Sequence, residues 1–371
     1  MSRLGDATMR KLRKRRILFC GYAPVHFVCF QPINARLSRI PFIDISYFVG
    51  QPARSEDTLT TQGTDRILRS FRIPSRRILS LERMRRESFD MVICGFVSGA
   101  FPKSDRTRIH LFHGVSFRNM AVRRDILIYD YLFNVGLYQM RLFREHGLIR
   151  DGDRRMVPVG FPKLDRMVNG ALDRVTILRR LGLSGRRPVI LYAPTGQKNN
   201  SLETVGEEVI HRLREAGCYD LLIKPHDHPR DKTIDWSKRL LAFEDAHTKV
   251  VRDFDIVPSL FVSDLLISDA SSVSAEYSLL DRPMVFIDVP QMIAAAQEKG
   301  ASLDLDTWGR KGGEVAQWPD EVVEAVRWSL AHPNAKSSVR KAMARDMFFY
   351  PGHATEKGVE WILNWFAMNS E

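Results

Sequence analysis

Short apolar runs alternate with longer amphipathic stretches along most of the chain. Runs of about four to eight residues rich in Ile, Val and Phe are typical of parallel strands buried on both faces. The candidate strands lie at 16–22, 43–50, 90–96, 108–114 and 126–136, and then at 188–195, 219–225, 250–254, 264–269 and 283–288. This alternation predicts an α/β protein with doubly wound sheets.

A segment rich in turn residues separates the two series of strands. It spans 157–174 and carries Gly160, Pro162 and Gly170. A length of 371 residues suits two α/β domains. We therefore expect Rossmann-like domains at 1–165 and 166–371, with an active-site cleft between the C-terminal ends of their strands. The amphipathic helix after Pro351-Gly352 either caps the second domain or crosses back to the first.

Charge is distributed unevenly between the two halves. Residues 1–190 contain 36 Lys and Arg against 16 Asp and Glu, whereas 191–371 contain 20 against 28. A cationic first half predicts an anionic partner, which can be a phosphate group, a nucleic acid or an acidic membrane surface. The basic clusters lie at 10–16, at 76–86 and at Arg123-Arg124.

The N-terminus resembles a secretory signal because a basic flank precedes apolar residues. Pro24 and His26 interrupt the apolar part, so we interpret 15–21 as the first strand. The apolar stretch at 91–101 is about half as long as a membrane-spanning helix. Four cysteines without a CxxC pair are typical of reduced thiols in a cytoplasmic protein.

The stretch "LISDASSVSAEY" runs from a buried strand straight into a helix. The strand ends at Asp269, and Ser271 and Ser272 fall at or near the start of the helix. Free backbone N–H groups at such a position favour an anion. The alternative is that serine there only caps the helix. Capping needs one hydroxyl, whereas this turn also offers Ser274.

Two further strand ends carry groups suited to phosphate chemistry. "LLIKPHDHPR" places Lys224 and His226 after a strand, which suits a diphosphate, although His226-Asp227-His228 is also compatible with a metal site. "ILYAPTGQKN" places Thr195 before a glycine that allows close approach to phosphate. The sequence contains neither GxGxxG nor a P-loop pattern at this turn.

A histidine follows a strand in the first half. In "IHLFHGVSFRNM", Gly114 allows a tight turn and leaves His113 at the edge of the sheet, five residues before Arg118. An imidazole is a suitable general base because its pKa lies near neutrality. The alternative is a half-buried histidine with a purely structural role.

The order and spacing of these motifs resemble the CDP-glycerol glycerophosphotransferase family of teichoic-acid-type polymer synthesis. The motifs are "HGVSFR" (113–118), "VGFPKLD" (159–165), "LYAPT" (191–195), "IKPH" (223–226), "SDASSVSAEY" (268–277) and the tail "YPGHATEKGVEWI". The resemblance runs from about residue 90 to the end of the chain. It implies a GT-B fold, with two Rossmann-like domains facing a cleft.

The resemblance also implies an activity and its partners. Such enzymes transfer a polyol phosphate from a CDP-activated donor and release CMP. They act as peripheral proteins on the cytoplasmic face of the cell membrane, on an acceptor linked to a prenyl diphosphate lipid. The basic first half then has a partner in an anionic membrane surface. No cofactor is implied with certainty, and any need for a divalent metal stays open.

Roles for individual residues follow from this resemblance. His113 and His226 are the expected catalytic histidines, with His113 as the base. Arg118 and Gly114 are expected at the acceptor or its phosphate. Arg118 stands where lysine is usual, and Lys163 stands where arginine is frequent. The expected donor-binding residues are Lys224, Ser271, Ser272, Thr195 and Asp269, with Glu276 at the ribose.

Three alternatives remain at this point. A GT-B nucleotide-sugar glycosyltransferase or a UDP-sugar 2-epimerase would share the diphosphate site. A non-enzymatic basic protein that binds membranes or nucleic acid would explain the charge. The chain lacks recognition-helix and RNP-type signatures, so we expect no nucleic-acid partner. The motifs do not distinguish glycerol from ribitol donors, or one added unit from many.

Overall fold

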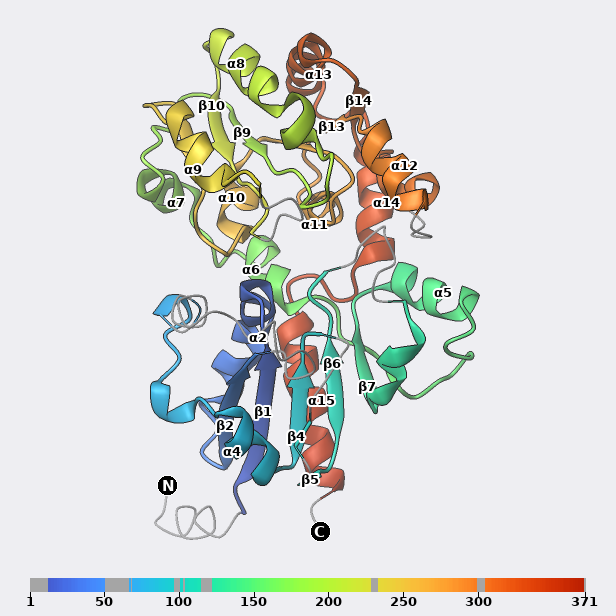
Figure 1. Cartoon of the computed structure of the whole chain (residues 1–371). Helices are drawn as coiled ribbons and strands as arrows, with labels where there is room; N and C mark the ends of the chain where they lie inside the picture. The colour runs from blue at the N-terminus through green and yellow to red at the C-terminus, as the bar shows by residue number, and fades with distance from the viewer. Residues whose placement is uncertain are drawn as a thin grey trace.

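Two six-stranded parallel sheets organise the protein (Figure 1). The structure is a computed structural model, and it describes residues 13–50, 67, 69–96, 101–102, 104–114, 122–227, 233–298 and 304–369. Figure 1 shows the first sheet below the second, with α6 and α14 at the level between them. The predicted α/β class with two doubly wound units is confirmed.

The first sheet has the strand order β2-β1-β4-β6-β7-β8. Neighbouring strands pair in parallel, so that Cys20 lies opposite Cys94 and Cys94 opposite His110. Its strands are β1 (Arg15–Gly21), β2 (Ile43–Val49), β4 (Met91–Cys94), β6 (Arg108–Leu111), β7 (Tyr131–Asn134) and β8 (Met156–Pro158). Around it lie α2 (Pro24–Leu37), α4 (Leu81–Arg86), α5 (Leu137–Glu145) and α15 (Ala354–Met368), and a small ladder joins β3 (Ser88–Phe89) to β5 (Ser104–Asp105).

The second sheet has the strand order β11-β10-β9-β12-β13-β14, in which the direction of winding reverses between β9 and β12. Its strands are β9 (Val189–Tyr192), β10 (Asp220–Ile223), β11 (Thr248–Val250), β12 (Leu265–Ser268), β13 (Met284–Ile287) and β14 (Glu314–Ala316). The helices are α6 (Asp165–Val168), α7 (Arg174–Arg180), α8 (Glu207–Glu215), α9 (Trp236–Arg239), α10 (Val257–Val262), α11 (Val273–Ser278), α12 (Pro290–Glu298), α13 (Pro319–Ala331) and α14 (Ser337–Met347).

The central strands form because they are apolar on both sides. Every residue of β4, β9, β10, β12 and β13 is buried. Helices on both faces of a parallel sheet remove both sides of each strand from water, and this favours continuous apolar runs over alternating ones. The first strand, β1, lies where the apolar run after the basic N-terminal cluster predicted it.

One predicted strand is wrong, and two strands at the sheet edges were not predicted. The predicted strand at 250–254 is wrong, because β11 ends at Val250 and the following residues form a loop. The short edge strands β8 and β14 were not predicted. Each has three residues and at least one of them is exposed or half-buried, so neither produces an apolar run.

The C-terminal helix crosses back to the first sheet. The Trp361 ring lies edge-on to Tyr131 of β7 at 4.6 Å between ring centroids. The Arg15 side chain of β1 donates to the carbonyl of Phe366 at 3.4 Å. Of the two alternatives for this helix, crossing back is therefore confirmed. The first unit contains α15, although the sequence division grouped that helix with 166–371.

The returning chain runs against two glycines of the first unit. The Phe349 N–H donates to the carbonyl of Val135 at 2.7 Å. A Cβ on Gly136 would lie 2.1 Å from the carbonyl oxygen of Met347, and one on Gly160 would lie 2.1 Å from that of Phe349. Asp165 accepts from the first two N–H groups of α15, Ala354 at 3.0 Å and Thr355 at 2.6 Å. The segment at 159–165 is therefore a joint between the two units.

Replacing Gly160 by alanine should destabilise this joint strongly. Gly160 has φ +91° and no room for a Cβ, whereas Gly170 has φ +80° and nothing within 4 Å. Gly170→Ala should cost about 1–2 kcal/mol through backbone strain alone. Gly160→Ala should cost about 1–3 kcal/mol more, because the chain must also move away. Urea unfolding of both variants measures the difference, and equal costs would contradict the close approach.

None of the helices within the described ranges is both long and apolar enough to cross a membrane.

Candidate functional site

Three predicted site turns meet at one edge of the second sheet. Strands β10, β9 and β12 are neighbours, and Lys224, Thr195 and Ser271 follow their respective C-terminal ends. Ligands of doubly wound sheets bind outside the carboxyl ends of the strands, at the point where the winding reverses. That point lies between β9 and β12, so the Thr195 and Ser271 turns flank it.

The serine turn before α11 is stabilised by the hydroxyl of Ser274 and not by that of Ser272. Ser272 is the N-cap of α11 and makes no side-chain capping bond. The Ser274 hydroxyl instead donates to the carbonyl of Ser271 at 2.8 Å. The interpretation of Ser272 as a simple side-chain cap is therefore wrong. Ser271 is buried and Ser272 is half-buried at the start of this six-residue helix.

Asp269 joins the two turns that flank the switch point. It is fully buried, and its Oδ1 accepts from the backbone N–H of Thr195 at 2.9 Å. Its Oδ2 accepts from the backbone N–H of Ser201 at 3.1 Å and from the hydroxyl at 3.0 Å. In this arrangement the carboxylate fixes the Thr195 turn relative to β12.

Lys224 and His226, in the turn after β10, differ in their exposure to solvent. Lys224 is buried, and its Nζ lies 2.5 Å from Oδ1 of Asp227 and 3.2 Å from the carbonyl of Pro225. His226 is exposed at the same sheet edge. Across the described ranges, no group of three or more His, Cys, Asp or Glu side chains could hold a metal ion. His228 lies outside those ranges.

His113 lies at the corresponding edge of the first sheet. Strands β1, β4 and β6 are neighbours there, and Gly95 and His113 follow β4 and β6. Nδ1 of His113 lies 2.9 Å from the carbonyl oxygen of Gly95. Since a carbonyl only accepts, Nδ1 carries the proton and Nε2 of the neutral ring carries the lone pair. This is the tautomer that a general base needs at Nε2.

The surroundings of His113 favour its neutral form. The side chain keeps solvent contact, but the protein packed around it removes water and lowers its pKa. The hydrogen bond to Gly95 acts in the opposite direction, and the charge of Lys163 lowers the pKa further. Burial and a nearby cation both disfavour imidazolium. The ring is therefore in the neutral form, which can accept a proton, at neutral pH.

The two halves of the predicted site meet across the units. A Cβ on Gly114 would lie 3.7 Å from Oγ of Ser272 and 3.9 Å from its Cβ. The His113-Gly114 turn of the first unit therefore faces the serine turn of the second. Arg118, the remaining acceptor-side prediction, lies outside the described residues.

Glu276 forms a buried ion pair between the units. Its Oε1 and Oε2 each lie 2.8 Å from Nζ of Lys163, and these side chains are 3% and 5% exposed. Glu276, the residue expected at the ribose, is therefore buried and paired with a lysine. Lys163 belongs to the short 3-10 turn Pro162–Leu164, so the pair connects the joint to α11.

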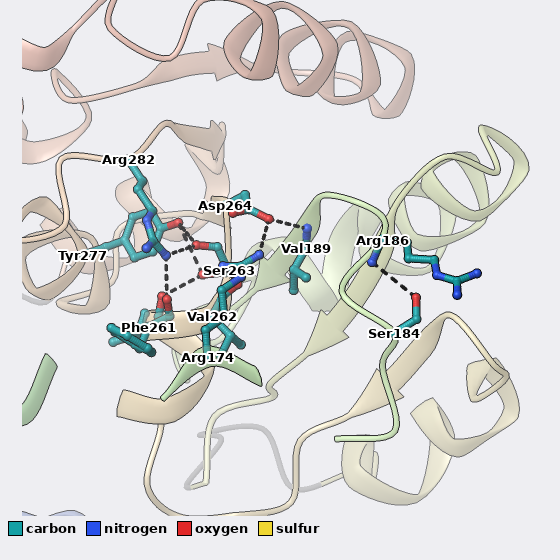
Figure 2. A network of polar contacts seen from close by, with 11 residues as sticks. Arg174, Ser184, Arg186, Val189, Phe261, Val262, Ser263, Asp264, Tyr277 and Arg282 are labelled. Carbon is teal, nitrogen blue, oxygen red and sulfur yellow. Dashed lines mark hydrogen bonds and ion pairs between the residues drawn. The ribbon is translucent and has the colours of Figure 1, made fainter. Parts of the chain in front are cut away.

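A polar network anchors the far end of α11 (Figure 2). The Tyr277 hydroxyl donates to the carbonyl of Ser263 at 2.9 Å, and the Arg282 guanidinium donates to the same carbonyl at 2.6 Å. Arg174 pairs with Asp264 at 2.8 Å, just before β12. These contacts fix α11 against α10 and the start of β12, and so hold the serine turn in position.

Sequence reasoning missed one residue of this region. His26 lies in the first turn of α2, and its ring centroid is 4.9 Å from that of His113. The rule that pointed to His113, a polar residue just after a parallel strand, also applies to His26 after β1.

Comparisons with known proteins identify the family and the fold of the chain. A family model described as CDP-Glycerol:Poly(glycerophosphate) glycerophosphotransferase matches residues 84–364. The teichoic acid glycerol-phosphate primase of Bacillus subtilis is 29% identical over 163 residues, which are 43% of this chain and 39% of the primase. The teichoic acid poly(glycerol phosphate) polymerase of Staphylococcus epidermidis is 26% identical over 213 residues, 50% of this chain and 29% of the polymerase. The chain thus spans less than half the length of these two relatives.

Two kinds of solved structure share the fold. The wall teichoic acid polymerase TagF has a TM-score of 0.66 at 16% identity, covering 98% of this chain and 92% of that one. A UDP-N-acetylglucosamine 2-epimerase has a TM-score of 0.56 at 14% identity, covering 97% and 98%. At these identities the likeness shows a common GT-B-like fold. The match over 84–364 shows more: the chain belongs to the CDP-glycerol:poly(glycerophosphate) glycerophosphotransferase family.

Proposed function

We propose that the protein transfers a polyol phosphate, glycerol phosphate in the first instance, from a CDP-activated donor to a hydroxyl group and releases CMP. The observation that carries this proposal is the meeting of the His113-Gly114 turn with Ser272 across the two units. This proximity supports a single site with a neutral imidazole on one side and the turn at the switch point on the other. Family membership supports the donor class, and the TagF polymerase that shares the fold has been soaked with CDPG.

The donor's diphosphate lies, in this proposal, against the carboxyl edge of the second sheet. Backbone N–H groups and hydroxyls of Ser271 and Ser272 would contact it from the turn after β12, and Lys224 and His226 from the turn after β10. Thr195 lies between them, held by Asp269. Donors fixed before the reaction stabilise the charge that spreads over the transferred phosphoryl group.

Glu276 and Lys224 would have to exchange partners to touch the donor directly. Glu276 is bonded to Lys163, and Lys224 to Asp227. A diphosphate competes with Asp227 for the lysine, because both are anions within reach of the same Nζ. Contact between Glu276 and the ribose remains part of the proposal, with Lys163 as its partner in the absence of the donor.

The chemical step joins the acceptor to the donor's distal phosphorus. The acceptor hydroxyl oxygen attacks the phosphorus that bears the polyol, while its proton moves to Nε2 of His113. The bond from that phosphorus to the bridging oxygen breaks, and CMP leaves with the bridging oxygen. Gly114, which lies opposite Ser272, is the proposed contact of the acceptor chain, and Arg118 is the proposed partner of an acceptor phosphate.

Acceptor-dependent CMP release tests this proposal. The purified protein is given CDP-glycerol, CDP-ribitol or UDP-sugars, with and without a prenyl-diphosphate-linked glycan. We expect CMP from one CDP-polyol, and only when the acceptor is present. UMP or UDP release, or no turnover with any CDP donor, would instead favour a glycosyltransferase or an epimerase.

We further propose a peripheral location on the inner face of the cell membrane, next to the lipid-linked acceptor. The first half of the chain is strongly cationic, and Arg76 and Arg85 are among its exposed residues. Each cation near an anionic surface contributes about 1 kcal/mol, and the attraction falls off with salt.

Binding to liposomes should therefore rise with the content of anionic lipid and fall with salt. Arg76→Ser with Arg85→Ser should weaken it about tenfold or more. The matched pair Arg179→Ser with Arg327→Ser removes two exposed cations of the second unit and should have little effect. Cosedimentation measures the binding. Equal losses from the two pairs, or binding that does not depend on salt, would contradict the membrane proposal.

A further inference from the structure

His26 is a buried histidine whose orientation is fixed by the backbone. It is 1% exposed, and its Nδ1 accepts from the N–H groups of Tyr22 at 3.2 Å and Ala23 at 3.3 Å. Both donors belong to the turn between β1 and α2. A nitrogen that accepts hydrogen bonds holds a lone pair, so the proton of this neutral ring is on Nε2. Two bonds to one ring atom also prevent the ring from flipping.

The fixed ring of His26 lies directly behind Gly95. A Cβ on Gly95 would be only 2.8 Å from Cγ of His26 and 2.9 Å from its Cδ2. The Gly95 N–H donates to the carbonyl of Cys20 at 3.2 Å. Its peptide is thus held on one side by β1 and on the other by the imidazole. Gly95 has little freedom to move toward α2.

The same peptide sets the tautomer of His113. The carbonyl oxygen of Gly95 accepts from Nδ1 of His113 at 2.9 Å. The His26 ring also contacts His113 directly, with 4.9 Å between centroids and 63° between planes. His26 therefore restricts the position of the His113 ring in two ways: it fixes the Gly95 carbonyl, and it contacts the ring directly.

We propose that His26 is a positioning residue for His113: by holding the Gly95 carbonyl and the edge of the His113 ring, it keeps the proton of His113 on Nδ1 and the lone pair on Nε2. The catalytic consequence rests on the proposed function, whereas the effect on the tautomer does not. An aromatic ring of similar size would fill the space but would lack the two backbone bonds that fix its angle. An asparagine would accept backbone bonds but would leave the space behind Gly95 empty.

Nitrogen-15 NMR of histidine side chains in the full-length protein tests the tautomer directly. The His113 signals are assigned by their loss in His113→Ala. In the wild-type protein Nδ1 should be protonated, and in His26→Ala and His26→Asn a substantial Nε2–H population should appear. The control His332→Ala removes a distant, exposed histidine and should leave the signals unchanged. A wild-type tautomer in both His26 variants would overturn the proposal.

Kinetics supply the second readout. His26→Ala should lower kcat for CMP release about 10–100-fold, as expected for a misplaced reacting group. The KM for the CDP donor should change by less than about threefold, because the donor contacts lie on the other unit. A loss that appears only in KM would contradict positioning. If even the wild-type protein releases no CMP, the proposed function is wrong. The role of His26 is then still decided by the tautomer of His113 in the NMR experiment.

A double-mutant cycle tests the contact behind Gly95. Gly95→Ala alone forces a Cβ against the His26 ring and should displace the carbonyl, with a fall in kcat. In the His26→Ala background the two ring contacts disappear and only the contact with Cβ of residue 26, at 3.0 Å, remains. The added effect of Gly95→Ala should therefore be at least about fivefold smaller. Additive effects would show that the two residues act separately and would overturn the proposed coupling.

Discussion

Replacing His113 by alanine should lower acceptor-dependent CMP release by about 10²–10⁴-fold, the usual contribution of a general base. The structure gives His113 the protonation state for this role, because Nδ1–H donates to the Gly95 carbonyl. Removal of water from around the ring lowers its pKa, so the base form persists below the ordinary histidine value of about 6.5. The acidic limb of the pH profile of kcat/KM should therefore lie below that value in the wild-type protein.

The matched control for His113→Ala is His332→Ala, which removes an imidazole that lies on Trp328 at the end of α13. It should retain the wild-type rate. The His113 variant should also lose the acidic limb of the pH profile, since no imidazole remains to be protonated. Near wild-type turnover, or an unchanged acidic limb, would show that another group takes the proton.

Breaking the Lys163–Glu276 pair should produce the largest loss of stability. Glu276→Ala leaves the Lys163 ammonium buried without its partner, and breaking buried pairs in this way costs about 3–5 kcal/mol. Lys163→Met combined with Glu276→Leu removes both charges and should recover most of the loss. Urea unfolding measures the three proteins. The single variant should also have less cooperative unfolding, because the pair connects the joint to α11.

A surface ion pair within the first unit is the control for this result. Arg36 of α2 and Glu356 of α15 lie 2.9 Å apart, with side chains 57% and 49% exposed. Glu356→Ala should cost no more than about 1 kcal/mol. If Glu276→Ala costs as little as Glu356→Ala, the pair is not a significant part of the joint. If the double variant is as unstable as the single one, packing rather than charge explains the loss.

The fold was largely predictable because its signal is local. Strands buried on both faces are largely apolar, so β9, β10, β12 and β13 are visible as runs in the sequence, with Asp220 and Ser268 as their polar members. The edge strands β8 and β14 have partly exposed residues and leave no such run. The position of β11 was predicted wrongly for a related reason. This strand begins at Thr248, which is polar but is buried by tertiary packing.

The site, like the fold, was predictable where the signal is local in sequence and not where it depends on tertiary contacts. Parallel strands bring their C-terminal ends to one edge, so Lys224, Thr195 and Ser271 were expected together and are found on neighbouring strands. Which side chains pair across the units depends on contacts between residues distant in sequence. The partner of Glu276 is 113 residues away, and no local pattern indicates it.

Several motif residues that suggested the family have structural positions at the joint. Gly160 approaches the Phe349 carbonyl, Lys163 binds Glu276, and Asp165 accepts from the first N–H groups of α15. In the sequence, 157–174 is the turn-rich segment that separates the two series of strands, and these contacts connect it to the tail of the chain. Recurrent motifs therefore mark both the proposed chemistry and the contacts that align the two sheets.

The central claim is that the second unit holds the donor while His113 of the first unit acts on the acceptor. Calorimetric titration with CDP-glycerol tests it most directly, using the wild-type protein, His113→Ala, Ser272→Asp and the control Ser184→Asp. Ser272→Asp places a carboxylate in the serine turn and should weaken donor binding at least about tenfold by repulsion of the diphosphate. Ser184 is exposed in the loop after α7, and its variant should bind normally. His113→Ala should bind CDP-glycerol normally but release no CMP. Loss of donor binding in His113→Ala, together with normal binding in Ser272→Asp, would contradict the central claim.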